Sequence, residues 1–183
     1  MLMPNKVIAA VRSHEELLKA ALSDVRIVFD LAPDILNVEE RAAILHKAGK
    51  KFFIHIDLAD GIGKDRSGII YAKNSGVDGI ISTRSAIIKI ARDAGLFTVQ
   101  RFFIVDSHSI DTTIEALKSS KAQMIEIMPG SVVKVIKTLK ETVEVPIIAG
   151  GLIETENEAM QAIKSGAAAV STGKQSLWGI KNE

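Results

Sequence analysis

Residues 145–173, VPIIAGGLIETENEAMQAIKSGAAAVSTG, contain a complete unit of β-strand, α-helix and β-strand. An apolar run at 145–148 is followed by a turn, a helical stretch that begins after Thr155, and a second run at 168–171. Thr155 and Glu158 have the spacing of a capping box at the start of a helix. Gly166 stands where a glycine commonly ends one. The segment therefore predicts two parallel strands joined by a helix.

The same unit recurs along the whole chain. Apolar runs rich in β-branched residues begin at intervals of about 19 to 26 residues, which is about the length of one compact βα unit. The runs lie at 7–11, 26–29, 52–56, 79–81, 97–100, 124–128, 145–148 and 168–171. Eight alternating units predict an α/β fold, a compact (βα)8 barrel of the TIM type with short loops. Residues 1–183 are expected to form it as a single domain.

The composition agrees with one domain and narrows the classes of function. Apolar residues make up 47% of the chain and aromatic residues 4%, so small aliphatic side chains must form most of the core. The 23 Lys and Arg nearly balance the 22 Asp and Glu, unlike a strongly basic nucleic-acid-binding protein. Without cysteine there can be no disulfide or thiolate metal site. We find no signal peptide and no apolar run of about 18 residues, so a cytoplasmic location is expected.

Polar residues gather at the carboxyl ends of the predicted strands, where barrels of this type place their sites. The residues just upstream are mostly apolar. In chain order the strand-end residues are Arg12, Asp30, His55, Asp57, Ser82, Thr83, Arg84, Ser85, Gln100, Arg101, Glu126, Gly150, Gly151, Ser171, Thr172, Gly173 and Lys174.

The last two strand ends have the features of a phosphate site. Glycines let backbone N–H groups approach an anion closely, and Ser and Thr hydroxyls add donors. A short helix at 175–179 would direct its N-terminus to the same place, as in the common phosphate site of this fold. The alternative is two tight turns that need glycine only for their geometry. The predicted phosphate contacts are Gly130, Gly150, Gly151, Ser171, Thr172 and Gly173.

A second set of strand-end residues predicts a polar cluster: His55, Asp57, Arg84, Arg101 and Glu126. Asp57 follows His55 by two positions and is expected to face the same side of its strand. Glu126 lies between two isoleucines, which directs it into the barrel, where a carboxylate needs a partner such as Arg84 or Arg101. Such a cluster can bind the hydroxyls of a small polyol or perform acid–base catalysis. An internal salt-bridge network without a ligand is the alternative.

Two kinds of chemistry lack the residues they need. A Schiff-base aldolase requires a lysine near a strand end inside the barrel, and the only strand lysine, Lys51, lies at the entry end. His55, Asp57 and Glu126 form a weak pattern for a metal site, because one histidine and two distant carboxylates make a poor ligand set. We therefore expect neither a metal nor a cofactor.

Six segments stand out when the strand ends are read with their neighbours: FFIHIDLADGI (52–62), DGIISTRSAII (78–88), VQRFFIVDS (99–107), IEIMPG (125–130), VPIIAGGLI (145–153) and AAAVSTGKQSLW (167–178). Together they resemble the glycerol-3-phosphate-responsive antiterminator family, the regulators of glycerol uptake operons. The similarity covers nearly the whole chain, in the family's order and spacing.

The resemblance implies a regulator and not an enzyme. Members of the family are expected to sense glycerol 3-phosphate and to bind the leader mRNA of a glycerol operon, so that transcription passes a terminator. By position, the phosphate contacts named above would hold the phosphate of this effector, or of a related phosphorylated polyol. The polar cluster would surround its glycerol end.

The RNA-binding part of this function is less visible in the residues. Affinity for RNA comes largely from Lys and Arg, yet the net charge is only +1. Lys134, Lys137 and Lys140 recur at helical spacing and could form a basic stripe, although a solvated helix face is the favoured interpretation of them. A homo-oligomer would assemble a larger basic surface. Two alternatives remain open: a small phosphosugar isomerase or lyase that uses His55, Asp57 or Glu126, and a metabolite-binding protein without an RNA partner.

Overall fold

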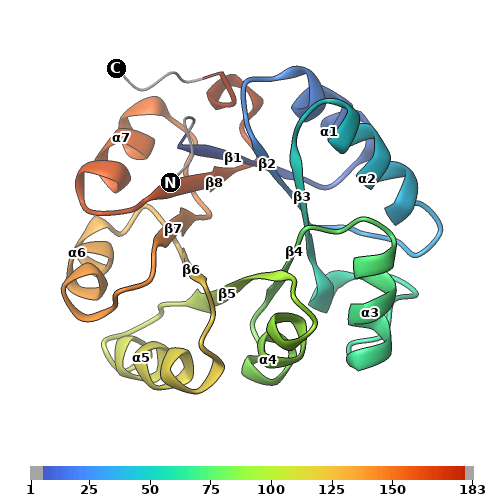
Figure 1. The fold of residues 1–183 in the computed structure, drawn as a ribbon. Coiled ribbons are helices and arrows are strands. Elements are labelled where there is room, and N and C mark those ends of the chain that lie inside the picture. The colour runs from blue at the N-terminus through green and yellow to red at the C-terminus, as the bar shows by residue number, and fades with distance from the viewer. Residues whose placement is uncertain (1–5, 180–183) are drawn as a thin grey trace.

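A computed structural model of the protein describes residues 6–179 and shows a closed barrel of eight parallel strands surrounded by helices (Figure 1). The strands are β1 (Val7–Val11), β2 (Ile27–Asp30), β3 (Lys51–His55), β4 (Gly79–Ser82), β5 (Phe97–Phe103), β6 (Met124–Met128), β7 (Ile147–Gly150) and β8 (Ala169–Thr172). The helices are α1 (His14–Leu22), α2 (Val38–Lys47), α3 (Arg66–Asn74), α4 (Ser85–Asp93), α5 (His108–Ser120), α6 (Val133–Thr142) and α7 (Glu156–Lys164). The predicted (βα)8 barrel is confirmed.

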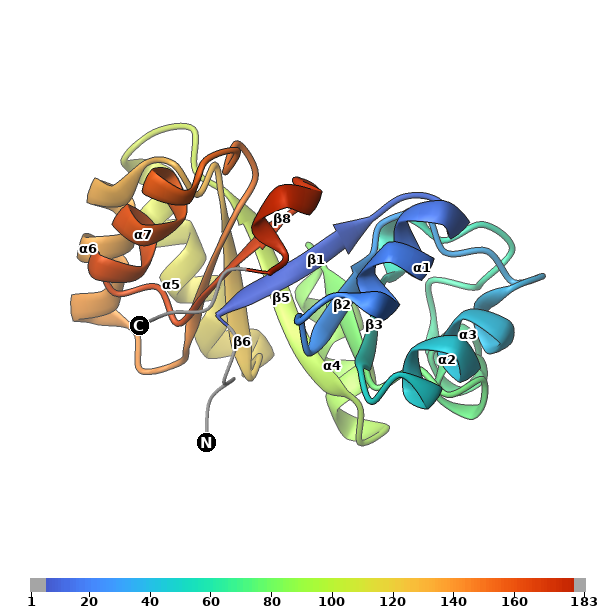
Figure 2. The ribbon, with the colours of Figure 1, turned by 90° about the horizontal axis from the view of Figure 1, so that it is seen from above.

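Each strand pairs with its neighbours in sequence, and β1 closes the ring by pairing with β8. In the view from above, α5 to α7 lie to one side of the barrel and α1 to α3 to the other (Figure 2). Because all eight strands are parallel, their carboxyl ends and the loops that follow them lie at one end of the barrel. None of the helices within residues 6–179 is long and apolar enough to cross a membrane.

Several element boundaries differ from the prediction. The seventh strand was expected at 145–148 but begins at Ile147, since Pro146 has no N–H to donate to the ladder. The fifth was expected at 97–100 but continues to Phe103, because it pairs with β6 as far as Met128. The helix expected at 175–179 is a single 3-10 turn, Gln175–Leu177. The other strand ends lie within one residue of the prediction.

The helix signals that the sequence provides are confirmed in the last βα unit. Thr155 accepts a hydrogen bond from the backbone N–H of Glu158, whose side chain accepts one from the N–H of Thr155 in return. This is the predicted capping box. Gly166, after α7, has a φ of 110°, a conformation that L side chains rarely adopt.

Strand alternation separates two apolar regions and positions the polar residues. Outward side chains pack against the helices, as Ile125 and Ile127 of β6 pack with residues of α5 and α6. Inward side chains fill the barrel, among them Ile8, Phe29 and Ile148. Towards the carboxyl end, the inward positions change from apolar to polar. A change of one residue in register would exchange the two faces.

Candidate functional site

A pocket of about 320 Å³ lies at the carboxyl ends of the strands, on the side formed by β1, β2, β5, β6, β7 and β8. It is small for a ligand site and suits a small metabolite. Polar and charged side chains form much of its wall, and they come from several loops. The lining residues are Ala10, Arg12, Leu31, Arg101, Glu126, Met128, Gly151, Leu152, Ile153, Glu154, Ser171, Thr172, Gly173 and Lys174.

Glu126 is the centre of a buried hydrogen-bonded group in this pocket. Its side chain is fully buried, and it accepts bonds from Arg101 Nε and Ser171 Oγ, each at 2.5 Å. The expected partner arginine is therefore Arg101. A Cβ at Gly150 would lie 2.5 Å from Glu126 Oε1 and 2.7 Å from Ser171 Oγ, so only glycine leaves room for both side chains. The buried charge is thus paired and hydrogen-bonded on both oxygens.

His55 is buried at the end of β3 and is not among the residues that line the pocket. Its ring is buried, and its Nδ1 has no hydrogen-bond partner in the structure. Burial and the positive charge of Arg101 lower its pKa to about 4, against a smaller opposing effect of Asp57. The ring is therefore neutral near pH 7. It is close enough to Arg101 to feel its charge, but it does not line the pocket.

Asp57 and Arg84 form a separate group. β3 ends at His55, so Asp57 lies in the 3-10 turn Ile56–Leu58, and strand alternation does not determine where its side chain points. Its carboxylate pairs with Arg84, Oδ1 lying 3.0 Å from Nε, and accepts bonds from the side chain of Ser82 and the backbone N–H of Thr83. Burial alone would raise the pKa of Asp57, but these bonds together lower it. The group holds the β4–α4 loop in place, and its members do not line the pocket.

Four of the six predicted phosphate contacts line the pocket, whereas Gly130 and Gly150 do not. Gly151 and Gly173 line the pocket with backbone that an anion could approach, and Ser171 also lines it, but its hydroxyl donates to Glu126. Thr172 also lines it, but its hydroxyl donates to the Ile153 carbonyl at 2.6 Å. The N–H of Gly130 donates to Gly150 O at 2.6 Å, so this glycine fastens the β6 loop to the β7 loop.

Two lining cations were not among the predicted contacts. Arg12 follows β1 and Lys174 follows Gly173, and both side chains belong to exposed residues. The sequence signal that could have identified them was their position at the ends of predicted strands. With Arg101 they bring three positive groups to the pocket, against the two carboxylates of Glu126 and Glu154.

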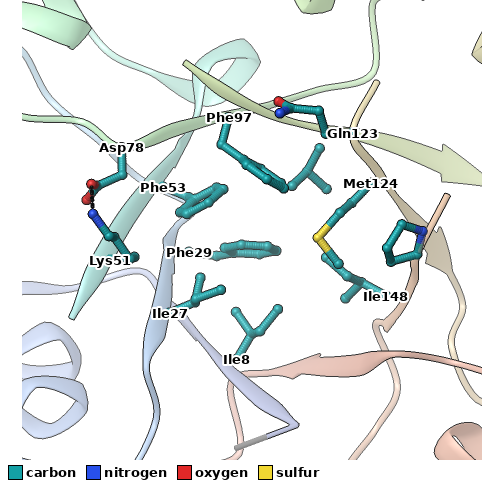
Figure 3. A pocket seen from close by; sticks show the side chains of 12 residues that line it. Ile8, Ile27, Phe29, Lys51, Phe53, Asp78, Phe97, Gln123, Met124 and Ile148 are labelled. Atoms are coloured by element: carbon teal, nitrogen blue, oxygen red, sulfur yellow. Dashed lines mark hydrogen bonds and ion pairs between the residues drawn. The ribbon is translucent and has the colours of Figure 1, made fainter. Parts of the chain in front are cut away.

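A larger hollow, about 490 Å³, lies at the opposite end of the barrel (Figure 3). Its wall is mostly aromatic and aliphatic, with Phe29 and Phe53 at its centre and ring centroids 5.6 Å apart. Lys51 lies here, as predicted, and pairs with Asp78 at 2.7 Å. The hollow lacks the convergent polar groups of the carboxyl-end pocket, which we take as the candidate site.

The described residues contain no cluster of three or more His, Asp or Glu side chains placed to hold a metal ion. Lys134, Lys137 and Lys140 are exposed on α6, as the basic stripe requires. The stem of Lys140 also packs over Gly166, where a Cβ would lie 2.9 Å from its Cγ.

Comparison with known proteins gives consistent relatives. The model of the family described as glycerol-3-phosphate responsive antiterminator matches residues 7–178. The uncharacterized protein YgcP of Escherichia coli K12 is 36% identical over 97% of this chain and 94% of its own. The glycerol uptake operon antiterminator regulatory protein of Listeria monocytogenes superposes with a TM-score of 0.91 at 28% identity, covering 97% of this chain and 98% of its own. The glycerol uptake operon antiterminator-related protein of Thermotoga maritima gives 0.86 at 32% identity, covering 96% and 99%.

Proposed function

Since the chain belongs to the glycerol-3-phosphate responsive antiterminator family, we propose that it binds glycerol 3-phosphate in the carboxyl-end pocket and regulates transcription in response. In the bound state it recognises the leader RNA of a glycerol-utilisation transcript. The observation that supports this best is the pocket itself, which is small and lies where this fold holds phosphates. Three cations line it, beside a polar floor that we define as Glu126 and Ser171.

The two ends of the ligand suit the two parts of the pocket. We place the phosphate beside Arg12 and Lys174, where the backbone of Gly151 and Gly173 also lines the wall. The glycerol hydroxyls then meet Glu126 and its bonded neighbours on the polar floor. Charged donors form the strongest hydrogen bonds to phosphate, so the two cations carry most of the affinity.

The same arrangement supports binding without turnover. A general base needs a carboxylate or imidazole within hydrogen-bond reach of the proton it removes. Both oxygens of Glu126 already accept bonds from Arg101 and Ser171, and the buried His55 does not line the pocket. Asp57 is committed to the β4–α4 loop. The protein therefore acts as a sensor and not as an isomerase or lyase.

Calorimetric titration of glycerol 3-phosphate tests the assignment of the cations. Arg12→Gln and Lys174→Gln should each weaken binding about ten- to a hundredfold, the worth of one charged hydrogen bond. Lys89→Gln, on the exposed face of α4, is the matched control and should bind as the wild type does. If the wild type and all three variants bind glycerol 3-phosphate with equal affinity, the phosphate does not bind beside Arg12 and Lys174.

The RNA role predicts coupling between two binding events. If glycerol 3-phosphate favours the RNA-binding state, it must raise RNA affinity by the factor by which RNA raises affinity for the ligand. Fluorescence anisotropy of a labelled glycerol-operon leader RNA, with and without ligand, measures this factor. Lys134→Gln with Lys137→Gln should lower the slope of log affinity against log salt by about 1.4, or 0.7 for each lost contact with single-stranded RNA.

The matched double control is Lys47→Gln with Lys89→Gln, on α2 and α4. It removes the same charge from other exposed faces and should leave the slope unchanged. Equal slopes in the two double variants would locate RNA binding elsewhere. If the affinity for RNA is the same with and without glycerol 3-phosphate, the two binding events are not coupled, and the protein is a metabolite-binding protein that does not regulate through RNA.

A further inference from the structure

The turn after β7 contains an unusual backbone conformation at the mouth of the pocket. Gly151 and Leu152 have φ values of 72° and 56°, so two successive residues adopt the left-handed conformation. Lys121, at the end of α5, is the other non-glycine residue with a positive φ within residues 6–179. A bulky side chain is strained in this conformation, whereas glycine adopts it freely.

Contacts on both sides of Leu152 hold the turn in this shape. The N–H of Gly130 lies 2.6 Å from Gly150 O and 3.1 Å from Gly151 O. The next residue, Ile153, is buried in the core, and its carbonyl accepts the hydroxyl of Thr172. The fold therefore fixes the backbone of Leu152 but does not require a leucine there.

The side chain of Leu152 is also unfavourable for stability, because it is apolar and exposed to solvent. It is 66% exposed in the structure, yet it lines the carboxyl-end pocket. An exposed apolar side chain in a strained conformation contributes little to folding. Strained residues persist mainly where function needs them, and they cluster at ligand sites.

We propose that Leu152 is an affinity-determining residue that closes the pocket over the bound phosphorylated polyol. This proposal rests on the function proposed above. When the ligand is bound, the isobutyl group covers it and excludes water from the contacts between the phosphate and the cations Arg12 and Lys174. Electrostatic attraction strengthens as water leaves, so closure slows dissociation more than it speeds association.

The test compares two exposed leucines. Leu152→Ala keeps the backbone conformation and removes the cover, so it should weaken binding of glycerol 3-phosphate about five- to twentyfold, mainly through faster dissociation in stopped-flow measurements. Leu36→Ala is the matched control, because Leu36 is 89% exposed in the β2–α2 loop and does not line the pocket. Leu152→Met should bind within about threefold of the wild type, since its side chain is similar in volume.

The variant Leu152→Gly distinguishes the effect of backbone strain on stability from the effect of the side chain on ligand binding. It relieves the left-handed strain, so its melting temperature should equal or exceed that of Leu152→Ala, while its affinity stays as low. Wild-type binding that survives unchanged in Leu152→Ala and Leu152→Gly would overturn the proposal and leave the proposed function intact. A wild type that does not bind glycerol 3-phosphate would overturn both.

Discussion

Glu126 shows how one residue can be placed from sequence while its surroundings cannot. Its position between Ile125 and Ile127 predicted an inward side chain, and the structure confirms this with a fully buried carboxylate. The choice of Arg101 over Arg84 as partner was not predictable. It depends on β5 extending beside β6, so that Arg101 and Glu126 are register partners. Arg84 lies in the β4–α4 loop instead and pairs with Asp57.

His55 makes a testable contribution to the pH dependence of stability. The pKa of the folded protein's His55, about 4, lies below the ordinary value of 6.5, so the folded state binds fewer protons than the unfolded state between these values. Stability should therefore fall as the pH drops from about 6.5 to 4, by up to roughly 3 kcal/mol for this group alone. Below the folded pKa the loss is complete, and above pH 6.5 this group contributes none.

Urea unfolding at several pH values measures this effect in the wild type and in His55→Asn, which lacks the titrating ring. The difference in unfolding free energy between the two proteins should change with pH in favour of the wild type as the pH rises from 4 to 6.5. A difference that stays constant over this range would show that His55 titrates normally in the folded protein.

Individual elements were more predictable than the contacts between them. β-branched runs and helix-ending glycines located eight strands, because both signals act through local backbone geometry. The predicted ends of β5 and β7 were wrong, since the length of a strand depends on its neighbours. β5 pairs with β6 as far as Phe103, and β7 begins after Pro146. Arg12 and Lys174 lay at predicted strand ends, but only the closed barrel brings them to one pocket.

A buried ion pair between Asp30 and Arg41 joins β2 to α2. Arg41 Nη1 lies 2.6 Å from Asp30 Oδ2, and both side chains are buried. Burial raises the pKa of Asp30, although the N–H of Ala32 and the charge of Arg41 oppose this effect. The pair is expected to set the position of α2 on the barrel more than to add net stability.

Removing one partner should therefore cost more than removing both. Arg41→Met leaves a buried carboxylate unpaired and is expected to lower the unfolding free energy by about 3–5 kcal/mol. The double variant Asp30→Leu with Arg41→Met replaces the pair with apolar groups and should recover most of that loss. Urea unfolding of the two variants measures both values. A single variant as stable as the double variant would mean that the carboxylate needs no partner.

Across the whole molecule, the barrel interior divides into an apolar half and a polar half. Phe29, Phe53 and Ile148 surround the hollow at the entry end of the strands, and the buried Arg101–Glu126 pair lies at the other end. The sequence already indicated this polarity, because polar residues followed apolar runs at nearly every strand end. RNA recognition has no comparable signature, since the charges nearly balance over the chain. The ligand site is therefore where the proposed function is most open to a direct test.

That test is phosphorus NMR of glycerol 3-phosphate mixed with the wild-type protein and followed for several hours. A sensor that binds without turnover should shift or broaden the ligand signal and produce no new peak. A new peak that grows with time would contradict this and make Glu126 and His55 candidates for catalysis. A sharp, unchanged signal at millimolar concentrations would show that glycerol 3-phosphate is not the ligand of this pocket.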